Sequence, residues 1–232
     1  MPKAIKKRRS KKIDVPEEEV QERLSTLKDA LQQRQGVMLK IGVGIAVLIA
    51  VVVSLLIYSH TAASKAKKLE YEAYTIYYGK ASQQAGARED RYGKALNIFK
   101  QAYQAKKSPF SLYYIAACSY ELGNYDEALK TLKDFTRKYS GEAEFLPLAY
   151  RKMSTIYLQK DNTAEAKKML DALYNLKGDI YKDFALMEYG KLLEREGKLD
   201  EAKSKYEELI TRFPTSPFKD EAQLKVAEKK EG

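Results

Sequence analysis

The longest run of hydrophobic positions extends from Ile41 to Tyr58 and contains no Asp, Glu, Lys, Arg or Pro. A soluble helix needs a polar face, and this run has none. As a helix it would be roughly 27 Å long, close to the thickness of the hydrocarbon core of a bilayer. The pattern therefore predicts a single transmembrane helix over residues 37–60.

The charges that flank this helix predict its orientation. The first 12 residues, MPKAIKKRRSKK, contain seven Lys and Arg and no acidic residue, whereas the lysines after the span are soon followed by Glu70 and Glu72. Because Lys and Arg are retained on the cytoplasmic side, we expect residues 1–36 in the cytoplasm and residues 61–232 outside it. KKRR is also compatible with a nuclear-localisation signal or a patch that binds lipid headgroups. The leader is too long for a cleaved signal peptide, so we expect an uncleaved signal anchor in a bacterial inner membrane, with a periplasmic C-terminal domain.

Two helix faces before and within the span could pair with another helix. Residues 1–36 read as a basic tail plus a short amphipathic helix, which starts near Pro16 and stops near Gly36. Its apolar stripe is Val20, Leu24, Leu27 and Leu31. Small residues recur every four positions in the span, at Gly42, Ala46, Ala50 and Ser54. Such a face permits close helix packing, in a homodimer or with another membrane protein, although small residues are also common in spans by chance.

After the span, the hydrophobic pattern repeats with a much longer period. An alanine recurs in comparable surroundings as Ala95, Ala128, Ala166 and Ala202, at separations of 33, 38 and 36 residues. An alanine allows two antiparallel helices to cross closely, and Gly123 and Gly197 suit helix ends that require positive φ. Ser-Pro pairs at 108–109 and 216–217 predict helix starts. The expected units are residues 71–107, 109–142, 147–179 and 183–216, followed by a capping helix over 217–229.

These spacings resemble the tetratricopeptide repeat (TPR), whose period is 34 residues. The stretch GKLDEAKSKYEELITRFP, from Gly197 to Pro214, carries the second-helix pattern. The first-helix positions of the same unit are Leu186, Tyr189, Gly190 and Leu193, although the chain lacks the tryptophan of the family. The resemblance implies an all-α fold, with a single N-terminal transmembrane helix followed by a TPR-like α-solenoid of helix-turn-helix repeats. In layout the chain is similar to ancillary subunits of the bacterial SecYEG translocon.

Composition and motifs argue against catalysis. The sequence has no Gly-rich phosphate loop, no nucleophile elbow and no His-Glu-x-x-His motif. Its only histidine, His60, ends the span, and its only cysteine, Cys118, lies among alanines on a predicted helix. We therefore expect no enzymatic activity, no cofactor and no metal. The net charge of +10 is divided evenly between residues 1–40 and the remainder, which is too weak an excess to predict nucleic-acid binding.

The resemblance to TPR proteins implies a concave groove that binds other proteins or extended peptides. Aligned with the repeats, the groove residues would be Phe110, Tyr113, Tyr120, Arg151, Met187, Lys191 and Arg195. They run from an aromatic end to a basic end, which suits a peptide with apolar and acidic groups. They could equally be ordinary exposed residues. Adaptors that clamp a peptide carboxylate use Lys and Asn where this chain has Tyr113, Ala117 and Phe184, so that activity is not expected.

The sequence thus predicts a membrane-anchored TPR scaffold or chaperone-like adaptor in envelope protein assembly or secretion. The alternative is a fixed structural or regulatory subunit of a membrane complex, paired through its transmembrane and cytoplasmic helices.

Overall fold

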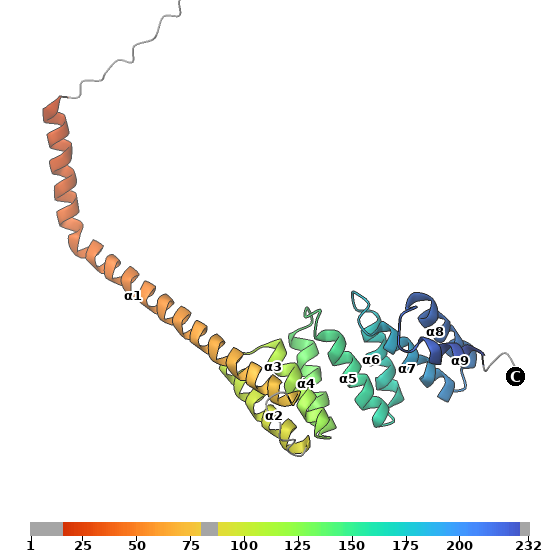
Figure 1. Cartoon of the computed structure of the whole chain (residues 1–232). Coiled ribbons are helices and arrows are strands. Elements are labelled where there is room, and N and C mark those ends of the chain that lie inside the picture. Colours follow the sequence, from red (N-terminus) through yellow and green to blue (C-terminus); the bar gives the residue numbers. More distant parts are fainter. Residues whose placement is uncertain (1–15, 80–87, 228–232) are drawn as a thin grey trace, which may run out of the picture. The chain divides into compact units, whose positions relative to one another are not determined.

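The computed structural model describes residues 16–79 and 88–227, and all of its regular elements there are helices (Figure 1). In chain order they are α1 (Glu17–Tyr77), α2 (Arg88–Ala105), α3 (Pro109–Glu121), α4 (Tyr125–Lys138), α5 (Leu146–Gln159), α6 (Thr163–Tyr174), α7 (Lys182–Arg195), α8 (Leu199–Arg212) and α9 (Lys219–Ala227). The chain divides into two compact units, residues 1–59 and residues 60–232. The basic tail and residues 80–87, within the first expected unit, lie outside the described residues.

In the first unit, the expectation that a helix stops at Gly36 is wrong, because α1 passes through this residue without a break. A glycine inside a helix costs only about 1 kcal/mol relative to alanine, and helix-forming residues flank it on both sides.

Within the described residues, α1 is the one helix that is long and apolar enough to cross a membrane, judged by length and composition. The small residues at 42, 46, 50 and 54 are exposed on it, and the Ser54 hydroxyl donates to the carbonyl of Ala50 at 2.8 Å.

The second unit is a row of antiparallel helix pairs, which follow one another from α3 to α9 in Figure 1. The pairs α3/α4, α5/α6 and α7/α8 occupy the ranges expected for three repeats, except that α5 and α7 each begin one residue earlier. Gly123 and Gly197 have positive φ values of 75° and 74° at the turns inside two pairs. Asp161 holds the same turn of the middle pair with a φ of 53°, although it has a side chain. A left-handed residue therefore ends the first helix of each of these pairs.

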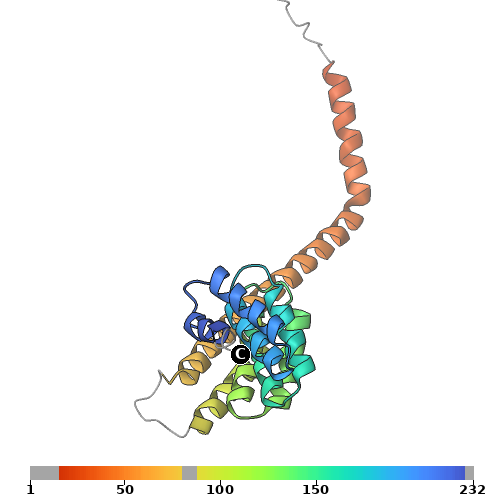
Figure 2. The same cartoon turned by 90° about the vertical axis from the view of Figure 1, so that its right-hand side faces the viewer.

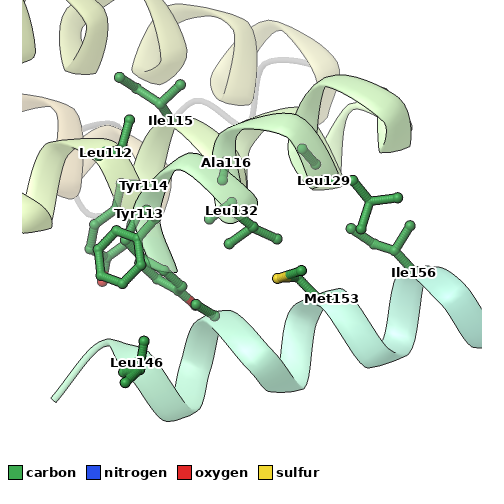
Figure 3. Packing of buried hydrophobic residues seen from close by; sticks show 14 of the residues in the cluster. Leu112, Tyr113, Tyr114, Ile115, Ala116, Leu129, Leu132, Leu146, Met153 and Ile156 are labelled. Carbon is green, nitrogen blue, oxygen red and sulfur yellow. The ribbon is translucent and has the colours of Figure 1, made fainter. Parts of the chain in front are cut away.

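Alanines and larger apolar side chains form the core of the solenoid. Ala95, Ala128, Ala166 and Ala202 are all completely buried, as expected for residues at close helix crossings. In Figure 3, Leu146, Met153 and Ile156 project from α5 toward the side chains of α3 and α4. This core extends from Ala73 to Leu192, and a second cluster joins α7, α8 and α9.

The end of α1 forms part of the first repeat. Ala66 and Ala73 are buried, and Glu70 accepts hydrogen bonds from two serines at the start of α3. The Ser111 hydroxyl donates at 2.6 Å, and the Ser108 hydroxyl also donates to the same carboxylate oxygen. Residues 60–77 thus serve as the first helix of the solenoid.

The last helix caps the other end, but it begins at Lys219 rather than at Pro217. Ser216 explains the shift, because its hydroxyl oxygen accepts from the backbone N–H of Phe218 at 3.1 Å and so forms a turn before the helix. The same hydroxyl donates to Asp183 at 2.7 Å, which ties the turn to the start of α7.

Candidate functional site

The first helices of three successive pairs, α3, α5 and α7, line a groove that consists of two adjoining cavities. Figure 2 views this unit from its C-terminal end, with α9 toward the viewer. The first cavity has a volume of about 230 Å³ and is lined by Tyr113, Tyr120, Leu148, Arg151, Lys152 and Thr155. The second, of about 380 Å³, is lined by Thr155, Leu158, Gln159, Phe184, Glu188, Lys191, Leu192 and Arg195. Thr155 lines both cavities, so the groove passes from one to the other along α5.

The structure brings together five of the seven residues that the sequence placed in the groove, namely Tyr113, Tyr120, Arg151, Lys191 and Arg195. Phe110 is not in this lining. The centre of its ring lies 4.7 Å from the ring centre of Tyr114 and 5.9 Å from that of Phe145. Phe110 thus belongs to the aromatic core of the first repeats.

The expectation that Met187 faces the groove is wrong. Its side chain is completely buried in the cluster formed by α7, α8 and α9. Met187 lies four residues before Lys191, so the sequence alignment placed both on one helix face. The groove instead contacts Glu188 on that turn of α7, because the helix is rotated to bury Met187 beneath the capping helix.

Several lining residues were not predicted as groove residues, among them Leu148, Lys152, Thr155 and Leu158. All four lie on α5, where the sequence analysis predicted only Arg151 as a groove residue. Their spacings of 3 and 4 residues mark one helix face, and this periodicity is the signal that could have identified them.

Each of the two groove lysines has an acidic partner. Lys152 lies 3.8 Å from Glu121, and its ammonium sits 4.0 Å from the ring centre of Tyr120. Burial lowers the pKa of Lys152, an effect that Glu121 partly offsets. Lys191 is within 3.3 Å of Glu188 and 3.0 Å of Glu221. The lysine charges are thus largely balanced by the protein itself.

The two groove arginines differ from the lysines in this respect. Within the described residues, neither Arg151 nor Arg195 lies within ion-pair distance of a carboxylate. Arg195 is exposed, whereas Arg151 is partly buried among aromatic rings. The groove therefore presents apolar walls together with unbalanced positive charge, which suits a partner with apolar and acidic groups.

A metal-binding group is not assembled in the described ranges, 16–79 and 88–227. No cluster of three or more His, Cys, Asp and Glu in them could hold a metal. The Cys118 thiol is completely buried, and burial, together with the nearby Glu121, raises its pKa to about 12. A thiol with so little thiolate near neutral pH is a core residue.

Two family models match parts of the chain. The model described as "Anaphase-promoting complex, cyclosome, subunit 3" matches residues 60–135, and that of the tetratricopeptide repeat matches residues 184–216. No curated protein sequence matches.

Solved structures of similar shape are available for comparison. MamA from Desulfovibrio magneticus RS-1 superimposes with a TM-score of 0.51 at 15% identity, over 72% of this chain and 96% of that one. The structure of pilF from Pseudomonas aeruginosa gives 0.51 at 19% identity, over 72% and 68%. A Podosopora anserina protein with nearly identical TPR-like repeats gives 0.52 at 14% identity, over 72% and 85%. At these identities the likeness shows the fold.

Together, the helix pairs and these matches define the fold class: an all-helical TPR-like solenoid. The last helix pair, α7 and α8, is the segment that the tetratricopeptide repeat model matches.

Proposed function

We propose that this protein is a membrane-anchored adaptor that binds extended segments of other proteins in the groove along α3, α5 and α7. The observation that carries the proposal is the continuity of the two cavities through Thr155. An extended segment of several residues can follow such a path, with side chains placed alternately in the two cavities. Binding is the whole of the activity, without catalysis, cofactor or nucleic acid.

The anchor is the apolar stretch of α1, and the proposed location is a bacterial inner membrane. In this arrangement the N-terminal tail is cytoplasmic and the solenoid is periplasmic, in accordance with the basic residues before the span. The function would belong to envelope protein assembly or secretion, as in the ancillary translocon subunits of similar layout. Anchoring concentrates the groove near proteins that emerge at the membrane.

Site-specific photocrosslinking in intact membranes tests the proposal. A photoreactive amino acid would replace Thr155 or Gln159 in the groove, and Lys168 on the opposite helix of its pair would serve as the matched control. We expect several partners to be captured from the two groove positions and not from Lys168. Equal capture of one stoichiometric partner from all three positions would contradict an adaptor and indicate a fixed subunit.

A fixed subunit is the second candidate, and the exposed faces of α1 favour it. Val20, Leu24 and Leu27 are exposed along the first turns, and the small residues of the span are also exposed. Either face could pair with a second copy or with another membrane protein. Deletion of residues 1–35 separates the two candidates, because an adaptor should keep its groove partners whereas a subunit held by these helices should lose its complex.

A further inference from the structure

The guanidinium of Arg151 is held between aromatic rings at the wall of the smaller groove cavity. Its central carbon lies 4.6 Å from the ring centre of Tyr181 and 5.0 Å from that of Phe184. Tyr113, on the neighbouring α3, lines the same cavity as Arg151. Contact between the guanidinium face and aromatic rings leaves the N–H edge of an arginine available for a ligand.

Backbone strain places one of these rings. Tyr181 precedes α7 with φ 60° and ψ 18°, a left-handed conformation that a residue with a large side chain rarely adopts. Such strain persists only where the surroundings fix it, and it is concentrated at binding sites. The backbone carbonyl of Tyr181 accepts from the N–H of Ala185 at 3.0 Å, so the strained residue also starts the helix. The position of the ring over Arg151 is therefore built into the start of α7.

Asp183, in the first turn of α7, already uses both of its carboxylate oxygens in hydrogen bonds within the protein. One carboxylate oxygen of Asp183 accepts from the backbone N–H of Phe184 at 2.8 Å, and the other accepts from the Ser216 hydroxyl at 2.7 Å. Arg151 thus combines partial burial among rings with no carboxylate partner in the described part of the chain. A partly buried cation without a carboxylate partner gains from an incoming anion, because a bidentate carboxylate supplies two charge-assisted hydrogen bonds to the guanidinium.

We propose that Arg151, framed by Tyr113, Tyr181 and Phe184, is a subsite for the carboxylate of an Asp or Glu side chain within an extended partner segment. A neighbouring apolar side chain of the segment would enter the adjoining cavity, against Leu158 and Leu192. The inference rests on the proposed function of the groove, whose partner chemistry it specifies. An internal acidic residue is favoured over a C-terminal carboxylate because the groove extends from Arg151 in both directions, to Tyr113 and Tyr120 on α3 and past Thr155 to α7.

The test uses the full chain in lipid nanodiscs and fluorescent peptides of defined composition. The first peptide is acetylated and amidated, with one Glu beside a Phe and a Leu in a neutral extended sequence. The second replaces that Glu by Gln, and the third keeps Gln but has a free C-terminal carboxylate. We expect the Glu peptide to bind about tenfold more tightly than the Gln peptide, as a charge-assisted bidentate pair allows.

Variants then assign this preference to Arg151. Arg151→Met should bring the Glu peptide to the affinity of the Gln peptide, while binding of the Gln peptide is retained. Arg151→Lys should lose most of the preference, because an ammonium cannot make the bidentate contact. Arg137→Met is the matched control, since this exposed arginine lies on α4 outside the groove lining, and it should change the preference by less than about threefold.

The outcomes separate this inference from the function on which it rests. If the Glu and Gln peptides bind equally, or if Arg137→Met removes the preference as completely as Arg151→Met, the subsite is wrong while the groove still binds segments. Binding of the free-carboxylate peptide alone would also overturn it and indicate recognition of a chain end. If no peptide binds, the inference fails, and crosslinking from Thr155, which needs no peptide, then decides whether the groove function fails with it.

Discussion

The ring of Tyr206 occupies the space beside Gly190 where a side chain would otherwise lie. A Cβ atom built on Gly190 would be 2.4 Å from Cε1 of Tyr206 and 2.7 Å from its Cζ. Gly190 belongs to α7 and Tyr206 to α8, and both residues are buried. The close approach of the two helices in this repeat therefore depends on the missing side chain at Gly190.

Gly190→Ala should destabilise the protein by about 1–3 kcal/mol, because the methyl group forces the tyrosine ring or the helix to move. Gly93→Ala is the matched control, since this glycine lies within α2 and a Cβ there would contact nothing within 4 Å. The control should be neutral or stabilising by up to about 1 kcal/mol, as expected for alanine in a helix. Urea unfolding of the full chain in detergent would measure both, and equal stability of the two variants would contradict the packing argument.

Met187 and Arg195 should respond to substitution in opposite ways, although both were expected in the groove. Met187→Ala should lower the free energy of unfolding by about 2–5 kcal/mol, because it leaves a cavity in a buried cluster. Arg195→Ala should change it by less than about 0.5 kcal/mol, since this side chain is exposed. Thermal unfolding of the two variants provides the comparison. A Met187 variant of native stability would mean that the residue does not pack as described.

The hydrogen bonds of Glu70 predict a local effect at the start of α3. Glu70→Gln removes the charge that accepts from Ser108 and Ser111, and should cost about 1–3 kcal/mol. Amide hydrogen exchange in the first turn of α3 should accelerate in this variant. The control, Glu72→Gln, changes an exposed residue two positions later and should leave that exchange unaltered.

Cys118 should react with iodoacetamide only when the protein unfolds. Its thiol is completely buried, and burial raises its pKa to about 12, so that both access and thiolate are scarce near neutral pH. Mass spectrometry should detect no adduct on the native chain and complete labelling in denaturant. Rapid labelling of the native protein would show that the middle of α3 opens readily.

The buried tyrosines predict unfolding at alkaline pH. Burial raises the pKa values of Tyr77, Tyr113, Tyr114 and Tyr206 above the ordinary value of 10.0, and that of Tyr139 to about 12. The native protein keeps these phenol protons above pH ~10 whereas the unfolded chain releases them, so stability is retained below that pH and falls as the pH rises beyond it. Tyrosinate absorbance and helical circular dichroism should change together. Titration of the phenols with no loss of helicity would contradict this prediction.

Local chemistry made much of the solenoid predictable. The predictable features depend on local geometry. Alanine is small enough for the closest helix crossings, glycine adopts the left-handed turn readily, and Ser-Pro favours the start of a helix, as at α3. Asp161 shows the limit of this reasoning, because it adopts the left-handed turn without being glycine. The uninterrupted passage of α1 through Gly36 was missed for a related reason, since a glycine permits a helix end but does not impose one.

The groove was less predictable because it depends on how each helix is rotated about its own axis. Alignment with the repeat placed Met187 and Lys191 on the same face, but the capping helix buries the first and leaves the second in the groove. The aromatic rings around Arg151 could not be predicted either. Their arrangement depends on the left-handed φ of Tyr181, and no sequence pattern predicts that conformation for a tyrosine.

The use of residues 60–77 as the first helix of the solenoid restricts how this protein can be released by proteolysis. A protease that cut between Ala73 and Tyr77 would remove Glu70 and the buried Ala73 from the first repeat, together with the hydrogen bonds that Glu70 accepts from Ser108 and Ser111. Cleavage before Ala66 would leave a C-terminal fragment that keeps the buried residues Ala66 and Ala73 of the first repeat. The same boundary applies to any shortened version prepared for crystallisation or binding assays, which should begin no later than about residue 60.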